Sequence, residues 1–311
     1  MTQFNNRRPG RRRADFATLC MVVTTVAVAV AGCQAAGDER PQAVAPVAIE
    51  KADPRLNDLA EKAIAQGRHG DAQRLLDRVL LADAKDTRAR LLMAELHLVT
   101  GSSERAVREF GQLTDDPAAS ARALQGKGLA LMRIGDNAMA YDSLRRAVDI
   151  DPTQWRAWNA LGYYHDSKRN WSDAEASYEN ALAANPESAL VYNNRGFSRL
   201  LQHRFDEAVE DLTKALELDP DLETTRVNLR LVMSWRGRYS RAMLGVSKKD
   251  SGKALNNVGF IALLRGDYST AESYFLRAME SDASFNKAAW RNLEYLRYLI
   301  EIETGETAAE R

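Results

Sequence analysis

The chain has 311 residues, of which 45% are hydrophobic and 28% are charged, with 43 basic and 43 acidic side chains. This composition is ordinary for a globular protein with enough apolar material for a core. Five arginines and one aspartate lie in the first 33 residues, so the remainder has 38 bases against 42 acids and a net charge of −4. A weakly acidic body argues against a nucleic-acid-binding surface.

Residues 1–32 are predicted to be a secretory signal peptide. An arginine-rich start is followed by the uncharged run FATLCMVVTTVAVAVAG at residues 16–32. A membrane-spanning helix needs roughly 20 apolar residues, so this run is short for one. A basic start, an apolar middle and small residues at the end are typical of an exported precursor. The pair Arg12-Arg13 leaves twin-arginine export open as an alternative route.

The end of this segment, VAGC at residues 30–33, resembles a bacterial lipobox. The resemblance implies that the chain is cleaved before Cys33 and that the Cys33 thiol carries a lipid. Cys20 lies in the segment to be removed, so the mature chain keeps one cysteine and has no internal disulfide. With Gln34 after the cysteine, we expect a lipid-anchored protein on the periplasmic side of the bacterial outer membrane, joined to it by a flexible tether over residues 33–52.

A repeat with a period of 34 residues occupies most of the remaining chain. Alanine recurs at this interval, and the last step is shortened to 29 residues, at Ala72, Ala106, Ala140, Ala174, Ala208, Ala242 and Ala271. A fixed interval of this length indicates helix pairs stacked in a repeat array. We predict units that begin near residues 53, 87, 121, 155, 189, 223 and 252. Glycine occurs where two helices of a unit should cross too closely for a side chain, at Gly128, Gly162, Gly196 and Gly259.

The fourth unit, WRAWNALGYYHDSKRNWSDAEASYENALAANP, resembles the tetratricopeptide family most fully. The matching residues are Trp158, Leu161, Gly162, Ala174, Tyr178, Ala181 and Pro186. The resemblance implies an all-α fold, a right-handed superhelical solenoid of about seven helix pairs over residues 53–303. Residues 284–303 have apolar side chains at helical spacing and are predicted to form a C-terminal capping helix. Residues 304–311 are expected to be a frayed tail.

The sixth unit departs from the pattern. Arg230 stands where the other units have glycine or alanine, and the second helix, YSRAMLGVSKKD, is five residues short. We therefore expect an irregular join in which residues 247–253, SKKDSGK, form a loop. The join is either a bend between residues 53–222 and 252–303 or a docking loop.

The chain lacks the motifs of an enzyme. Its four histidines, at positions 69, 97, 165 and 203, are scattered without metal-ligand spacing, and no glycine-rich phosphate loop is present. His97 and His165 occupy packing positions, and Cys33 would be acylated. We expect no catalytic residue, no metal site, no cofactor and no enzymatic activity.

Paired asparagines are the best functional indication in the sequence. YNNRGF at residues 192–197 and LNNVGF at 255–260 place them in the middle of predicted helices, where each asparagine costs ~0.6 kcal/mol relative to alanine. Their amides, with both donor and acceptor, could hold the backbone of an extended peptide, or they could bond across units and hold the register. On the first interpretation the peptide-binding groove comprises Asn159, Tyr163, Asn193, Asn194, Phe197, Asn228, Asn256, Asn257 and Phe260.

Residues 189–303 resemble the assembly lipoprotein of tight-adherence (Flp, type IVb) pili. The matching phrases are YNNRGFSRLL, RVNLRLVMSWRGRYSRA and ALNNVGFIALLRGDYSTAESYFLRA. The resemblance implies an outer-membrane-anchored periplasmic scaffold that binds pilus or secretin components and assists their assembly. Three alternatives remain open: a pilotin-like or barrel-assembly lipoprotein, a chaperone for exported polypeptides, and a regulatory subunit of an envelope enzyme.

Replacing Cys33 by alanine should release the protein from the membrane, because alanine has no thiol to acylate. Cell fractionation with and without detergent measures the change. Cys20→Ala is the matched control, and it should leave the protein in the membrane fraction, since Cys20 is removed with the signal peptide. A wild-type protein that is fully soluble without detergent would contradict the anchor.

Overall fold

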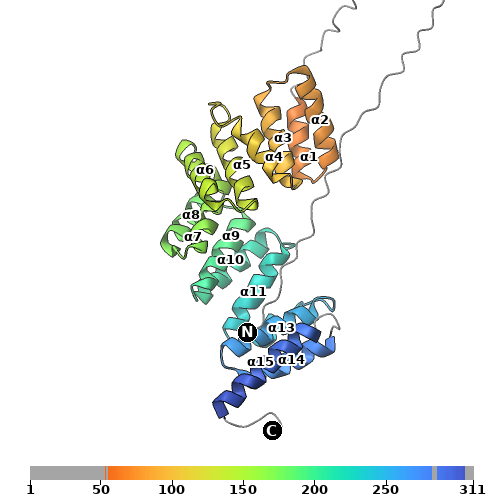
Figure 1. Cartoon of the computed structure of the whole chain (residues 1–311), viewed down its shortest axis with the longest axis vertical. Helices are drawn as coiled ribbons and strands as arrows, with labels where there is room; N and C mark the ends of the chain where they lie inside the picture. The colour runs from red at the N-terminus through yellow and green to blue at the C-terminus, as the bar shows by residue number, and fades with distance from the viewer. Residues whose placement is uncertain (1–52, 54, 282–285, 305–311) are drawn as a thin grey trace, which may run out of the picture. The chain divides into compact units, whose positions relative to one another are not determined.

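The computed structural model describes residues 53, 55–281 and 286–304, and all of the regular structure in them is α-helical (Figure 1). The predicted signal peptide, the lipidated Cys33, the tether and residues 305–311 lie outside the described residues. None of the described helices is long and apolar enough to cross a membrane.

The described helices form seven consecutive pairs and one closing helix, which confirms the predicted all-α repeat architecture. The first helices of the pairs are α1 (Arg55–Ala65), α3 (Thr87–Val99), α5 (Ser120–Arg133), α7 (Trp155–Ser167), α9 (Ala189–Leu201), α11 (Glu223–Trp235) and α13 (Ser251–Leu264). The second helices are α2 (His69–Ala82), α4 (Ser103–Gly111), α6 (Asn137–Ile150), α8 (Trp171–Ala184), α10 (Phe205–Leu218), α12 (Tyr239–Ala242) and α14 (Tyr268–Ser281). The closing helix is α15 (Asn286–Thr304), so Thr304 belongs to this helix and not to a frayed tail.

Small residues allow the two helices of a pair to cross closely, as the sequence predicts. The repeated alanine is fully buried in every second helix, with at most 1% of its surface exposed. A Cβ added to Gly162 would lie 2.6 Å from the Tyr178 ring, and one added to Gly196 would lie 2.9 Å from Cγ of Leu212. Any side chain at these glycines would therefore force the helices apart.

One large side chain in each second helix except α12 fills the space that the small residues leave. These side chains are at most 1% exposed, and they are Leu76, Phe110, Leu144, Tyr178, Leu212 and Phe275. Each packs within its own pair and towards the next, so the core is a series of local clusters along the chain rather than one centre.

Most turns within a pair use a residue in the left-handed backbone region. Glycine supplies it in several units, for example Gly135 at φ +86°. In the fourth and fifth units the equivalent positions are Arg169 at φ +58° and His203 at φ +61°. The fold therefore keeps its turn geometry even where the residue does not favour it.

The sixth unit is irregular, and its physical cause is local. α12 ends at Ala242, and Gly245 takes a left-handed φ of +69° that no α-helix contains. A longer α12 would also place Lys249 at the position where α6, α8, α10 and α14 each bury an alanine, such as Ala215. The helix therefore stops early.

The predicted loop over residues 247–253 is wrong in its second half. Residues 251–253 form the first turn of α13, and the Ala254 amide donates to the Asp250 carbonyl over 3.0 Å. Gly252 is buried in that turn. The non-helical segment of the sixth unit is thus residues 243–250.

Replacing Ala174 by leucine should overpack the α7–α8 contact and cost about 1–3 kcal/mol of stability, because Ala174 is 0% exposed. The loss of hydrogen-exchange protection should stay within α7, α8 and the adjacent pairs. Ala176→Leu, on the exposed face of the same helix, is the control and should have little effect. Uniform loss of protection across all pairs would contradict local coupling.

Candidate peptide-binding groove

The first helices α7, α9 and α11 together line a hollow of about 440 Å³. Five of the nine residues predicted for the groove lie in its lining: Tyr163, Asn193, Asn194, Phe197 and Asn228. The remaining lining residues are Asp166, Ser167, Tyr178, Leu190, Leu201 and Thr224. The lining of the hollow comes mainly from the first helices of these pairs.

Large apolar side chains lie open to solvent along this hollow. Tyr163 is 60% exposed, Leu190 45%, Phe197 37% and Leu201 46%. A neighbouring group of exposed apolar side chains is typical of a binding surface, since burying it against a partner gains about 25 cal/mol per Å². We call this lined hollow the groove.

Four asparagines form a continuous chain of hydrogen bonds beneath the groove. The Asn194 side-chain amide donates to Oδ1 of Asn159, and the Asn228 amide donates to Oδ1 of Asn193, both over 3.0 Å. Asn193 in turn donates to Oδ1 of Asn194 over 3.0 Å, which joins the two bridges. Thr225 also donates its hydroxyl to Oδ1 of Asn193. The chain links α7, α9 and α11.

These bridges follow one rule. The sixth residue of a unit donates to the fifth residue of the unit before it. The same geometry joins α13 to α15, where the Asn292 amide donates to Oδ1 of Asn256 over 2.9 Å. These bonds between units agree with the second of the two interpretations of the asparagines, in which they hold the register of the repeat.

The bridges do not use the full hydrogen-bonding capacity of every asparagine. Asn193 is 6% exposed and has accepted two bonds and donated one, so its role is structural. Asn194 and Asn228 are half-buried in the groove lining, and each retains one unused N–H of its amide. These two amides can both hold the register and face a bound chain.

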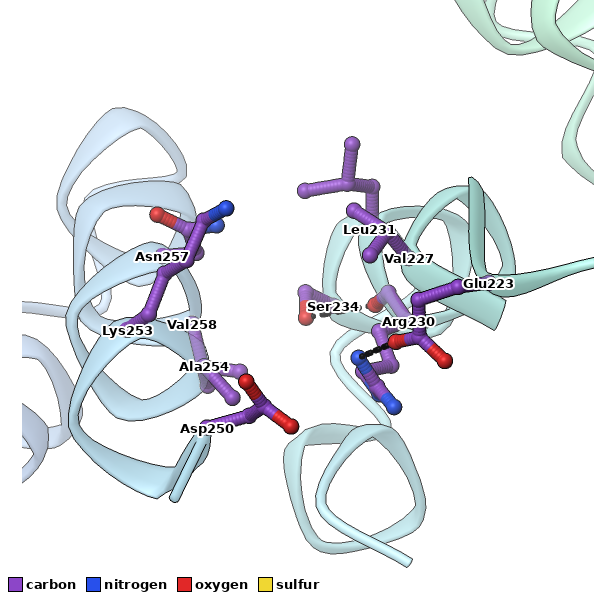
Figure 2. Close-up of a pocket in the computed structure, with 10 residues that line it drawn as sticks. All are labelled: Glu223, Val227, Arg230, Leu231, Ser234, Asp250, Lys253, Ala254, Asn257 and Val258. Atoms are coloured by element: carbon purple, nitrogen blue, oxygen red, sulfur yellow. Dashed lines mark hydrogen bonds and ion pairs between the residues drawn. The ribbon is translucent and has the colours of Figure 1, made fainter. Parts of the chain in front are cut away.

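The bridging rule fails at the join between α11 and α13. By position, Asn257 should donate to residue 227, but that residue is Val227, which has no acceptor. Both residues line a second hollow of about 120 Å³, in which Figure 2 shows α11 and α13 facing each other. Arg230 pairs with Glu223 across 3.5 Å on the α11 side.

The remaining predicted groove residues do not join the main hollow. Asn256 bonds to Asn292, and Asn257 lines the second hollow. Phe260 is 41% exposed on α13 and lines neither hollow. The two Asn-Asn phrases therefore lie in different surroundings, and the nine predicted groove residues do not all line one hollow.

Asp166 is the acidic group of the groove. It accepts hydrogen bonds from the Tyr178 hydroxyl over 2.8 Å and from the Ser198 hydroxyl over 2.6 Å, and so connects α7, α8 and α9. Burial raises the pKa of Asp166 above its usual value, although both hydroxyls oppose the shift. Burial and the neighbouring Asp166 carboxylate raise the pKa of Tyr178.

On the other side of α9, buried ion pairs hold it against its neighbours. Arg195 pairs with Asp211 over 2.7 Å, and Arg199 pairs with Glu175 over 2.6 Å and with Asp211 over 2.9 Å. Burial alone would raise the pKa of Glu175. The hydrogen bond from Arg199 and the charges of the nearby arginines outweigh burial and lower this pKa below its usual value. These pairs fix the face that α9 presents to the groove.

No group of three or more His, Cys, Asp or Glu side chains that could hold a metal ion occurs in the part of the chain that the structure describes. His97 is 7% exposed and contacts Glu109 over 2.6 Å. His165 packs edge-on against the rings of Tyr141 and Tyr164. Both histidines thus have the packing role that their positions indicate.

Models of the tetratricopeptide repeat family match residues 63–128, 121–154 and 189–222. The Type IV pilus assembly protein PilF of Pseudomonas aeruginosa is 33% identical over 188 residues, which cover 58% of this chain and 74% of PilF. A Lipoprotein NlpI homolog of Haemophilus influenzae is 35% identical over 81 residues, 26% of each chain. The matched stretch spans only 24% of the human Tetratricopeptide repeat protein 6, at 26% identity.

Two solved structures share the fold. The Cut9–Hcn1 hetero-tetramer of the APC/C aligns with 79% of this chain and 50% of its own, at a TM-score of 0.55 and 15% identity. A thermophilic TPR protein of Thermus thermophilus aligns with 61% of this chain and 98% of its own, at a TM-score of 0.50 and 21% identity. At these identities the likeness concerns the fold alone.

Replacing Asn193 by alanine should destabilise the protein by about 1–3 kcal/mol, because the Asn228 amide and the Thr225 hydroxyl would lose their buried acceptor. Asn257→Ala is the matched control. Asn257 makes no such bridge to another described residue, because residue 227 is a valine. Its replacement should therefore leave the melting temperature unchanged or slightly raised, since alanine is the better helix former. Equal effects of the two substitutions would contradict the bridging role.

Proposed function

This chain belongs to the tetratricopeptide-repeat family, and we propose that it is a scaffold that holds an extended segment of a partner protein in the groove of α7, α9 and α11. The observation that carries the proposal is the composition of the groove. Exposed apolar side chains, Leu190, Phe197 and Leu201 among them, lie beside the half-buried amides of Asn194 and Asn228. Amides can bond a peptide backbone without reading its sequence, while apolar side chains receive those of the partner.

The size of the groove favours a short segment. Neighbouring packed helices lie about 8–10 Å apart, so three successive first helices span roughly 20 Å. An extended chain covers ~3.3 Å per residue, and about six residues would therefore cross the groove. A segment of this length would contact each of the three helices.

The proposed partner belongs to the assembly machinery of a pilus of the type IV kind. Two observations support this: the similarity to PilF over most of that protein's length, and the phrases at residues 189–303 that resemble the tight-adherence pilus lipoproteins. We propose a secretin or another pilus component as the bound protein.

We further propose that the scaffold is anchored in the bacterial outer membrane and faces the periplasm. The lipobox at residues 30–33 supports this place, as does the similarity to an NlpI lipoprotein homolog. Residues 34–52 could span at most ~65 Å when extended. Such a tether would keep the groove near the membrane in which a secretin assembles.

Photo-cross-linking in the native host tests this function directly. A photoreactive phenylalanine analogue at Leu190 or Leu201, both in the groove, should cross-link to a pilus or secretin component, as identified by mass spectrometry. The matched control is the same analogue at Leu81, which is 76% exposed on α2 and should not yield that product. Cross-links to many unrelated polypeptides would instead favour the chaperone alternative, and equal products at Leu81 and the groove would contradict the proposal.

A further inference from the structure

Over the described part of the chain, the lining of the groove contains one acidic side chain and no basic one. Asp166 is its one carboxylate, and no lysine, arginine or histidine occurs among the residues that the structure places in its lining. The other polar lining groups are amides and hydroxyls, which are neutral at physiological pH. The groove therefore presents a single negative charge to whatever enters it.

The Asp166 carboxylate accepts hydrogen bonds but forms no ion pair with the residues that the structure describes. Its two bonds come from the neutral hydroxyls of Tyr178 and Ser198, one to each oxygen. Among the ion pairs of the described residues, Asp166 takes part in none. A carboxylate offers about four lone-pair positions, so about half of its accepting capacity remains open.

Two neighbouring buried acids, unlike Asp166, form ion pairs. Glu175 and Asp211, on α8 and α10, lie away from the groove lining, and both are paired with arginine. The fold thus neutralises the buried carboxylates of its interior and leaves uncompensated the one that faces the groove. A half-buried charge without an ion-pair partner costs free energy in the unbound protein. Burial raises the pKa of Asp166 for the same reason, because it disfavours the charged form.

We propose that the groove selects segments in which a lysine or arginine lies next to apolar residues, with the basic group bound at Asp166. This inference rests on the proposed function of the groove and names the chemistry of its ligand. The apolar neighbours of the basic residue pack on Phe197 and Leu201, which are exposed in the same lining. Tyr163 stands three residues before Asp166 on the same helical face, where its ring can stack on the basic side chain.

Selection then has both an attractive and a repulsive part. A lysine restores charge balance at Asp166 in a partly desolvated place, where a charge-assisted hydrogen bond is stronger than at an open surface. A glutamate at the same position of the segment places two carboxylates side by side and is rejected. Because the contact is electrostatic, added salt weakens it.

Binding of three short capped peptides to the full mature protein, measured by fluorescence anisotropy, tests the inference. The peptides are identical except for a central lysine, glutamine or glutamate between leucines. The lysine peptide should bind about tenfold more tightly than the glutamine peptide, and the glutamate peptide more weakly than both. Raising the salt concentration should lower the affinity of the lysine peptide until it is close to that of the glutamine peptide.

Asp166→Asn should abolish the preference for the lysine peptide over the glutamine peptide. The melting temperature of the unbound variant should be unchanged or higher, because a carboxylate that burial disfavours is removed. Glu179→Gln, an exposed acid on α8, is the matched control and should keep the preference. A purely structural role of Asp166 predicts the opposite result, a lower melting temperature together with equal losses for all peptides.

The outcomes separate this inference from the proposed function. If wild-type protein binds the lysine and glutamine peptides equally, the charge selection is wrong while the groove still binds peptide. If it binds none of the three peptides, both the groove's proposed function and the inference are wrong. The salt dependence is measured on the wild-type protein, so the test holds even if Asp166→Asn does not fold.

Discussion

The close approach of Gly162 to the Tyr178 ring is the constraint on which the groove depends. Because Gly162 has no side chain, the ring lies directly on α7, where a Cβ would be only 2.6 Å away. The ring is 1% exposed, yet its hydroxyl reaches Asp166 in the groove lining. Core packing therefore places the acidic group of the surface, and a change in the helix crossing would move the binding groups with it.

Amide bridges between units add a second level of order. They lie in the first helices, which face the groove, and they connect α7 to α9 and α9 to α11 by bonds of 3.0 Å. Peptide binding was one of the two roles that the sequence left open for these asparagines. It is not the main role of Asn193, because Asn193 is buried and its Oδ1 accepts two structural hydrogen bonds. Where Val227 interrupts the pattern, the hollow between α11 and α13 opens (Figure 2).

The sequence predicts the repeat well because its causes are local and periodic. Alanine and glycine at a fixed interval can serve only close helix crossings, and the structure has them there. The partners of the asparagines are harder to foresee, since Asn194 meets Asn159 only after a whole unit is stacked. Asp166 looks like a solvated acid near a helix end. Its half-buried state arises from Tyr178 on the next helix and from Ser198, which is 32 residues away.

The most direct measurement of the central claim is a crystal structure of the protein with the lysine-containing peptide bound. The account predicts an extended peptide backbone lying across α7, α9 and α11, within hydrogen-bonding distance of the Asn194 and Asn228 amides, and an ammonium group on the Asp166 carboxylate. A peptide seated in the hollow between α11 and α13, or on the outer face of the second helices, would contradict it.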